Sequence, residues 1–255
     1  MSYQSVFKRY ELKYMLTLEQ KQHLLAVMDR YMSIDKYGRT TIRNIYFDTD
    51  TYQLIRRSIE KPIYKEKLRV RSYGLASPDS KVFVELKKKY KSTVYKRRTS
   101  TSEYDAMEWL TGKQASPEHT QISSEIDYFL KYYATLHPAV YLSYEREAYY
   151  CRDGGDFRVT FDENILARQT DLSLCSEPYG TSLLKDGLVL MELKCSGGVP
   201  LWMVRALSEE RIYKTSFSKY GTAYEKIIFP TVTKGSVAGD KYTDQKEKKE
   251  NLINA

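Results

Sequence analysis

The stretch Lys81–Lys89 reads KVFVELKKK, and it decides the fold. Apolar side chains alternate strictly in it with charged or aromatic ones. Such an alternation is typical of a β-strand whose two faces meet different surroundings. One face holds two valines and a leucine, while the other carries Glu85 among lysines. The stretch therefore predicts a strand with one apolar face and one highly charged face.

Other stretches of the chain repeat this pattern. Six more strands with one charged face are expected at Val6–Leu16, Lys65–Tyr73, Thr93–Thr99, Val140–Arg146, Phe157–Glu163 and Leu188–Lys194. An eighth, Thr40–Asp48, is apolar and aromatic with a less charged face. Apolar residues at helical spacing, or helix-start signals, predict helices between the strands. These helices are expected at Thr17–Tyr31, Thr51–Ile59, Ser102–Leu110, Ile122–Tyr133 and Pro200–Arg211.

The repeated charged faces indicate how the strands are arranged. Like charges on one face of a flat sheet repel each other, so an anion should compensate them. A closed barrel can hold that anion inside, and closure also removes the edges of the sheet. We therefore predict an α+β fold, a barrel of about eight strands with helices packed on the outside, over residues 1–230. Residues 231–255, which include KEKKE at 246–250, are expected to be a flexible polar tail.

The composition of the chain limits the partners and the kinds of binding site that it can have. The formal net charge of +8 points to an anionic partner, which could be nucleic acid, a phosphorylated small molecule or an acidic membrane surface. No apolar run is long enough to span a membrane, and the three cysteines show no paired spacing, which together favour a cytoplasmic protein. The sequence contains no glycine-rich phosphate loop, zinc pattern or serine nucleophile elbow. Any phosphate binding must then come from side chains.

The charged strand faces combine many bases with few acids. The bases are Arg9, Lys13, Lys67, Arg69, Arg71, Lys87, Lys89, Lys96, Arg98, Arg146, Arg158 and Lys194. Lysine and arginine can neutralise a polyphosphate directly, but acids in the same site would repel it. A divalent cation between acid and phosphate removes that repulsion. Glu11, Glu85 and Glu192 are therefore candidate metal ligands, with an inward salt bridge as the alternative for each; the fourth acid is Asp162.

A set of short motifs follows in order along the chain. They are FKRYELKY (7–14), IYFDT (45–49), KLRVRSY (67–73), VFVELKKK (82–89), VYKRR (94–98), YLSYEREAY (141–149), RVTFD (158–162), LMELK (190–194) and FSKY (217–220). Together they resemble the polyphosphate polymerase domain of the vacuolar transporter chaperone (VTC) family, within the triphosphate tunnel metalloenzymes. The resemblance covers about residues 7–220.

The resemblance implies an eight-stranded antiparallel tunnel that binds a triphosphate or polyphosphate with Mn²⁺ or Mg²⁺. It also implies phosphate-binding roles for Lys13, Arg69, Arg71, Lys87, Lys96 or Arg98, Arg146, Arg158, Ser218 and Lys219. Tyr144 matches a phosphate-contacting tyrosine, and Glu192 matches a metal-binding glutamate. Lys194 is added to the expected phosphate-binding residues because it lies on the charged face of its predicted strand. Of these residues, Arg69, Arg71, Lys87, Arg146 and Lys219 are expected to act on the transferred phosphoryl group.

Two departures from the family pattern refine this expectation. The wider superfamily begins with ExExK, whereas this chain has Arg9 in place of the first acid, which agrees better with the polymerase branch than with the hydrolases. Eukaryotic members carry a phosphate-sensing helical domain and transmembrane helices, which this sequence lacks. Any association with a membrane would therefore need a separate membrane-protein partner.

The predicted function is ATP-dependent polyphosphate synthesis, with ATP and inorganic polyphosphate as partners and no nucleic acid. A triphosphatase that uses the same tunnel is one alternative, with Glu11 or Glu85 positioning the attacking water. A non-catalytic receptor for polyphosphate, nucleotide or RNA is the other, because the 24 tyrosines could stack on bases.

Overall fold

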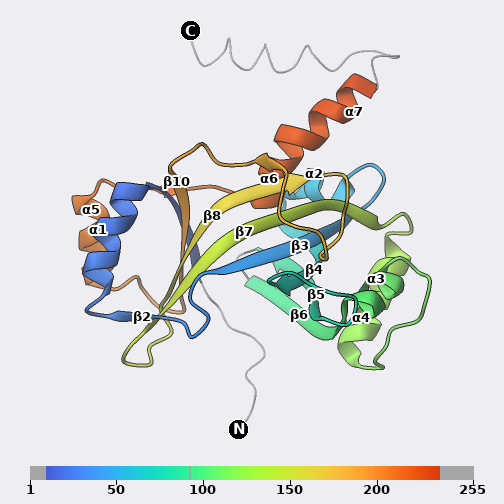
Figure 1. Cartoon of the computed structure of the whole chain (residues 1–255), viewed down its shortest axis with the longest axis horizontal. Helices are drawn as coiled ribbons and strands as arrows, with labels where there is room; N and C mark the ends of the chain where they lie inside the picture. Colours follow the sequence, from blue (N-terminus) through green and yellow to red (C-terminus); the bar gives the residue numbers. More distant parts are fainter. Residues whose placement is uncertain (1–9, 92, 236–255) are drawn as a thin grey trace.

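The computed structural model describes residues 10–91 and 93–235, which form one antiparallel sheet with helices around it (Figure 1). The strands are β1 (Tyr10–Thr17), β2 (Met32–Ile34), β3 (Thr40–Asp48), β4 (Tyr64–Tyr73), β5 (Lys81–Tyr90), β6 (Thr93–Ser102), β7 (His137–Cys151), β8 (Arg158–Arg168), β9 (Thr181–Ser182), β10 (Leu188–Cys195) and β11 (Lys214–Thr215). Their order is β11-β1-β10-β8-β7-β3-β4-β5-β6, with β2 added to β7 and β9 to β8. The α+β class and the eight long strands are confirmed.

The prediction of a closed barrel of eight strands was wrong. In the described ranges the sheet has eleven strands, and its backbone pairing ends at β11 on one side and at β6 on the other. The sheet nevertheless curls strongly, because Glu11 of β1 comes within 3.6 Å of Lys87 of β5, although five strands separate β1 from β5 in the sheet. Charged side chains, rather than backbone hydrogen bonds, bridge the opening. Charged edge strands such as β6 also disfavour edge-to-edge pairing.

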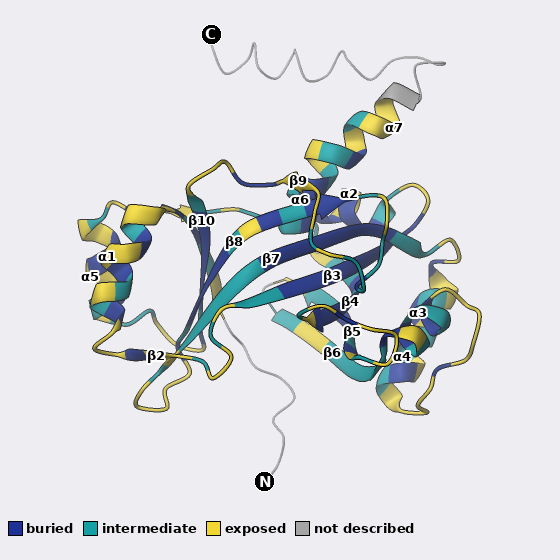
Figure 2. Cartoon of the chain, in the orientation of Figure 1, coloured by how far each residue is buried: buried dark blue, intermediate teal, exposed yellow. Residues whose placement is uncertain are grey.

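Two pairs of helices cover the convex face of the sheet. The helices are α1 (Leu18–Met28), α2 (Gln53–Ile59), α3 (Glu103–Leu110), α4 (Gln121–Tyr132), α5 (Leu201–Glu209), α6 (Lys219–Ala223), the π-helix η1 (Tyr224–Ile228) and α7 (Phe229–Gly235). Helices α1 and α5 pack over β1, β8 and β10 through Leu24, Met191 and Met203. Helices α3 and α4 pack over β4 and β5 through Val84 and Trp109. Figure 2 shows the inward sides of both pairs as buried.

Helices α2 and α6 instead fill one end of the concave face. Ile55 of α2 and Tyr220 of α6 are buried there against Leu142 and Leu190. The buried carboxylate of Asp48 joins the two helices, because it accepts hydrogen bonds from the backbone of Leu54 and Ile55 and from the Tyr220 hydroxyl, at 2.8 to 3.0 Å. The FSKY segment is thereby fixed against the charged strands.

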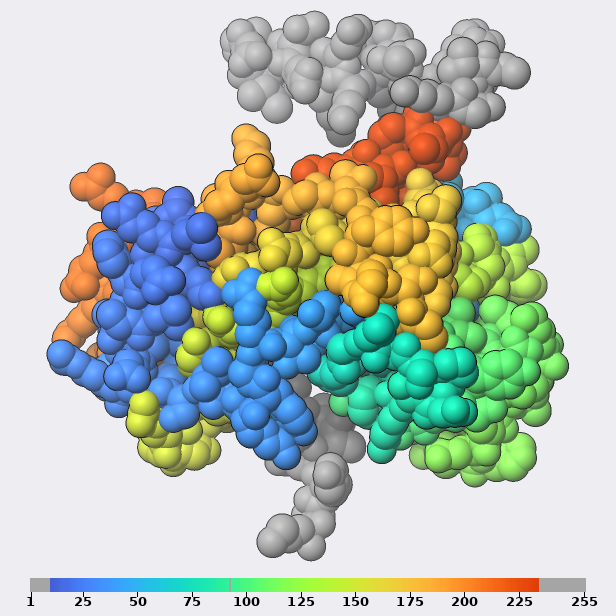
Figure 3. Space-filling model, viewed as in Figure 1, coloured from blue at the N-terminus to red at the C-terminus, as the bar shows by residue number. Residues whose placement is uncertain are grey.

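The remaining segments close the outer surface. The segment 169–180 packs against the β4–β5 turn, where the Ala76 amide donates to the Leu174 carbonyl, and Figure 3 shows the two segments in contact. A flexible polar tail was predicted for residues 231–255, but helix α7 continues to Gly235 and so includes the first five of them. Residues 236–255 lie outside the described residues, as does Arg9. Among the residues that the structure describes, no helix combines the length and apolar character that crossing a membrane requires.

Candidate functional site

The centre of the concave face is a buried glutamate surrounded by bases. Glu85 of β5 is 1% exposed and forms ion pairs with Arg69 at 2.6 Å, Lys96 at 2.6 Å and Arg98 at 2.9 Å. The antiparallel register dictates this cluster, since Arg69 of β4 and Arg98 of β6 both stand directly opposite Glu85. Burial raises the pKa of Glu85, but Arg69, Arg71 and Lys96 outweigh it and hold the pKa well below its usual range. Both carboxylate oxygens of Glu85 therefore already have cationic partners.

A second buried acid organises the neighbouring strands. Asp162 of β8 is fully buried and accepts two hydrogen bonds from Arg146, at 2.6 and 2.7 Å, and one from Lys219 at 2.5 Å. Burial raises its pKa, whereas Arg146 and Lys219 lower it, and the net result is a pKa of about 2. Asp162 thus fixes two predicted phosphate-binding side chains that come from β7 and α6.

The low pKa of Asp162 predicts how stability depends on pH. The pKa falls from an ordinary 3.8 to about 2 on folding, so this contribution is complete above about pH 4 and is lost as the pH falls through about 2. We expect the free energy of unfolding, measured by urea denaturation, to fall across this window. In an Asp162→Asn variant the fall should be smaller, because the titrating group is gone while Glu85 and Glu192 remain. An unchanged acid dependence in the variant would rule out Asp162 as the source.

Two further acids lie at the junction of β1 and β10. Glu192 contacts Lys194 at 2.5 Å, while Glu11 contacts Lys13 and Lys87 only at 3.5 and 3.6 Å. Burial raises the pKa of both carboxyls, but the lysines lower both below their usual values. Glu192 also raises the pKa of Glu11, which means that the two negative charges are close enough to repel each other.

This pair fits a divalent cation. Mg²⁺ is commonly held by one or two carboxylates together with phosphate oxygens, and a cation would relieve the repulsion between Glu11 and Glu192. Thr160, which stands directly opposite Glu192 on β8, has a buried hydroxyl without a hydrogen-bond partner in the described part of the chain. No group of three or more potential ligands gathers among the described residues, so the ligand would have to supply oxygens as well.

Tyrosines and an asparagine orient the central arginines. Arg69 donates to the Tyr46 hydroxyl at 2.8 Å. Arg71 donates to the Asn44 side chain at 2.9 Å and to the Tyr144 hydroxyl at 3.1 Å. Burial raises the pKa of both tyrosines, but the arginines outweigh it and the net shift is downward. Guanidinium groups held in this way are ready to receive an anion without reorganising.

The FSKY segment contributes from the filled end of the concave face. The Ser218 hydroxyl accepts from the Gly221 amide at 3.1 Å and from Lys67 at 3.3 Å. Lys219 lies over the ring of Tyr144, 4.4 Å from its centre. The backbone carbonyl of Phe217 accepts from Lys13 at 2.9 Å. Both residues predicted from FSKY therefore lie beside the predicted strand residues.

Most of the predicted residues meet in these three clusters, but Arg158 and Ser218 do not. Glu85 forms ion pairs with Arg69, Arg71, Lys96 and Arg98. Asp162 forms ion pairs with Arg146 and Lys219, which both lie over the ring of Tyr144. Glu11 pairs with Lys13 and Lys87, and Glu192 pairs with Lys194. Arg158 instead stacks on Tyr150, 4.8 Å from its ring centre. Sequence reasoning missed Asn44 and Tyr46, although Tyr46 lies in the IYFDT motif and Asn44 directly precedes it; in the structure both stand opposite the arginines of β4.

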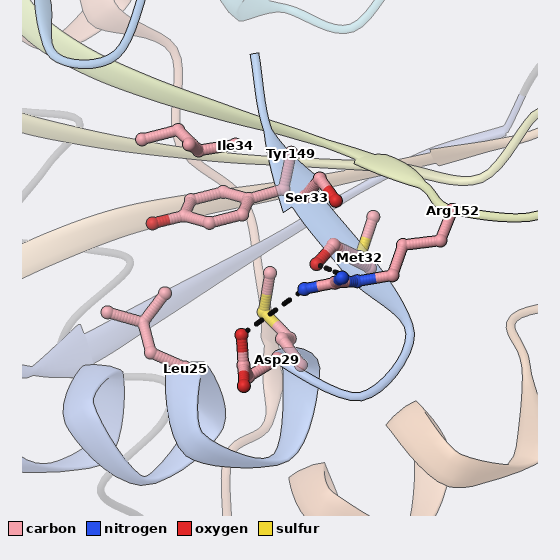
Figure 4. Close-up of a pocket in the computed structure, with 8 residues that line it drawn as sticks. Leu25, Asp29, Met32, Ser33, Ile34, Tyr149 and Arg152 are labelled. Carbon is pink, nitrogen blue, oxygen red and sulfur yellow. Dashed lines mark hydrogen bonds and ion pairs between the residues drawn. The ribbon is translucent and has the colours of Figure 1, made fainter.

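A cavity elsewhere holds none of these residues. It has a volume of about 480 Å³ and lies between α1, β2 and β7 (Figure 4). Its lining is largely apolar, with Leu25 and Tyr149, and its one arginine, Arg152, already contacts Asp29 at 3.4 Å and the carbonyl of Met32. The charged concave face is therefore the better candidate for the functional site.

Solved structures and one family model are similar to this chain. A proposed adenylate cyclase from Bacillus halodurans has a similar structure, with a TM-score of 0.53 and 15% identity, over 84% of this chain and 95% of that one. A proposed adenylyl cyclase from Hippeastrum, described as having a dominant triphosphatase activity, matches with a TM-score of 0.46 and 14% identity, over 82% and 92%. At such identities the likeness of the first concerns the fold alone, and no curated protein matches the chain. The family model of the VTC domain matches residues 8–228, and the chain therefore belongs to the VTC domain family.

Proposed function

We propose that the chain is a polyphosphate polymerase that transfers the γ-phosphoryl group of ATP to the end of a polyphosphate chain. One observation carries the proposal: arginines from three strands are held in place on one concave face by buried acids and tyrosines. Phosphoryl transfer depends mainly on positioning and charge neutralisation, which fixed guanidinium groups provide. Membership of the VTC domain family supports the same substrate class.

In the proposed reaction, a terminal phosphate oxygen of the acceptor chain forms a bond to the γ-phosphorus of ATP. The bond from that phosphorus to the β–γ bridging oxygen breaks, and its electron pair leaves with ADP. Arg69, Arg71 and Arg146 would neutralise the transferred group, and Lys219 would contact it from the side of α6. The acceptor oxygen is already ionised at neutral pH, so the reaction needs no strong general base.

Glu192 and Glu11 would hold the divalent cation, Mn²⁺ or Mg²⁺, together with phosphate oxygens. Bound there, the ion supplies charge neutralisation to those oxygens. Lys194 and Lys13 contact the two acids in the protein alone and would turn to the phosphates when the ligand binds.

This assignment predicts the behaviour of a Glu192→Gln variant. We expect it to lower the rate of phosphoryl transfer by about two orders of magnitude and to need a higher Mn²⁺ concentration, because one charged metal ligand is lost. Rates measured across an Mn²⁺ titration check both effects. Glu209→Gln, an exposed change on α5, is the matched control and should behave like the wild type. An unaltered metal requirement in Glu192→Gln would argue against the metal-binding role.

A triphosphatase is the second candidate, and the loose contacts of Glu11 favour it. This carboxylate is 32% exposed and contacts its lysines only at 3.5 and 3.6 Å, so it could orient a water molecule. Glu85, whose oxygens are both engaged, is less suited to that role. Incubation with tripolyphosphate and measurement of released orthophosphate separates the two functions. High turnover without chain growth from ATP would favour hydrolysis.

A further inference from the structure

Helices α3 and α4 cover only part of the convex face of β4, β5 and β6. Leu86 of β5 is buried beneath them, and Arg97, which stands directly opposite it on β6, pairs with Glu125 of α4. Strand alternation places Lys88 and Tyr90 on the same face, further along β5. Tyr90 is exposed, and in Figure 1 this end of β5 and β6 lies away from α3. The convex face is therefore left uncovered where β5 turns into β6.

Five exposed tyrosines gather at this uncovered end. They are Tyr64 of β4, Tyr90 of β5, Tyr95 of β6 and Tyr128 and Tyr132 of α4, and we call them the tyrosine corner. Their exposed fractions run from 41% to 68%, so their rings are open to a partner. Tyr64 stands directly opposite Tyr90 in the sheet, and the rings of Tyr128 and Tyr132 are stacked with their centres 6.2 Å apart.

A buried glutamate joins the strand part of the tyrosine corner to the helix part. Glu66 of β4 accepts a hydrogen bond from the Tyr64 hydroxyl at 2.5 Å and another from the Tyr133 hydroxyl of the α4 end at 2.9 Å. The ring of Tyr133 in turn contacts that of Tyr132, with the ring centres 4.8 Å apart. The tyrosines of the sheet and those of α4 thus form one continuous surface.

Lysines accompany the exposed rings. Lys88 stands directly opposite Tyr95, and the ammonium group of Lys91 lies 5.6 Å from the ring centre of Tyr90. Lys131 is exposed on α4 between the two tyrosines of that helix. In the part of the chain that the structure describes, these three lysines form no ion pair. The surface suits a partner that offers flat rings and negative charge together.

We propose that the tyrosine corner is a docking surface for single-stranded nucleic acid, with bases stacked on the tyrosines and phosphates held by the lysines. Every base has a π-face, so aromatic side chains beside cations bind single strands with little regard to sequence. Exposed aromatic side chains on a sheet receive RNA bases in the same way. A lipid surface would instead select large aliphatic side chains, and Ile63 is the exposed one that adjoins Tyr64.

This surface is independent of the proposed function. It lies on the opposite side of the sheet from the charged concave face, because Glu66 and Lys88 alternate along their strands with residues of that face. The sequence analysis expected no nucleic-acid partner. Alternation predicts which side of a strand a tyrosine occupies, but it does not show that the covering helices stop short of these rings.

Fluorescence anisotropy with a labelled oligouridylate tests the proposal. Excess tripolyphosphate is added to compete for the charged concave face. We expect Tyr132→Ala and Tyr90→Thr each to weaken binding by roughly five- to a hundredfold, since one stacking platform is lost. Tyr104→Ala removes a comparably exposed ring from α3 and should leave the affinity unchanged. A sugar–phosphate chain of equal length without bases should bind weakly to the wild type and be insensitive to the tyrosine changes.

The salt dependence gives an independent readout for the lysines. Lys91 has a left-handed backbone with φ of 52°, which asparagine tolerates, so Lys91→Asn removes the charge without straining the turn. We expect the slope of log Kd for the oligouridylate against log salt concentration to decrease by about 0.7 in this variant. Tyr132→Ala should keep the wild-type slope, because it removes a ring and no charge. Thermal melts verify that the variants remain folded.

Several outcomes would overturn the proposal. Equal affinity for the oligouridylate and the chain without bases, or wild-type affinity in both tyrosine variants, would show that the protein merely attracts polyanions. Loss of binding on addition of tripolyphosphate would move the nucleic acid to the concave face. Vesicles of phosphatidylcholine and phosphatidylserine are the remaining probe. If the tyrosine variants lose only vesicle binding, the occupant is a lipid surface and not a nucleic acid.

Discussion

Replacing Glu85 by glutamine should destabilise the free protein by about 3–5 kcal/mol, because it leaves several buried cations without their shared counter-ion. In the wild type this carboxylate, 1% exposed, separates Arg69, Lys96 and Arg98. Urea unfolding with and without tripolyphosphate measures the effect. Added tripolyphosphate should restore more stability to Glu85→Gln than to the wild type, since the ligand can supply the missing negative charge.

The control for this experiment is Glu108→Gln. Glu108 pairs with Lys113 at 2.7 Å, and the lysine side chain is 65% exposed, so breaking this pair should have little effect on stability. The two variants together show whether Glu85 acts as a counter-ion for the buried bases or as a metal ligand. A Glu85→Gln protein of normal stability that needs more Mn²⁺ for activity would identify Glu85 as a metal ligand and contradict its assignment as a counter-ion.

Arg146→Ala should have the largest effect on activity. The change removes a guanidinium proposed to neutralise the transferred phosphoryl group, which typically costs about 100- to 1,000-fold in rate. It also leaves the fully buried Asp162 with Lys219 as its remaining partner, so stability should fall as well. Rates at saturating ATP, measured at a temperature where the variant is still folded, check the first effect.

Two companion variants separate charge from geometry at this position. Arg146→Lys keeps the charge but cannot make both hydrogen bonds to Asp162, so its activity should lie between that of the wild type and that of Arg146→Ala. Arg97→Ala removes an arginine that pairs with Glu125 of α4, away from the candidate site, and should leave the rate unchanged. A wild-type rate in Arg146→Ala would contradict its proposed role.

Periodicity predicted the strands well but not how the sheet ends. The alternation in Lys81–Lys89 matches β5, and the eight long strands all occur where the sequence places them. The short strands β2, β9 and β11 contain only two or three residues, too few to show a period. Closure depends on edge pairing, which alternation does not specify, and so the open ends at β6 and β11 could not be predicted.

The candidate site was predictable in composition but not in pairing. The charged faces identified Arg69, Glu85 and Arg146, yet register alone decides that Glu85 faces two arginines across β4 and β6. Asp162 was recognised as an acid of the charged faces, but its bidentate contact with Arg146 depends on the pairing of β7 with β8. The same limit hid Asn44 and Tyr46, whose importance comes from lying opposite Arg71 and Arg69.

The measurement that tests the central claim most directly is the fate of the γ-phosphoryl group of ATP. Purified protein is given γ-labelled ATP with Mn²⁺, and the products are separated by size. The proposed function predicts label in polyphosphate chains that lengthen with time, together with an equal amount of ADP. Label found only in orthophosphate, or an unchanged pool of ATP despite bound polyphosphate, would contradict it.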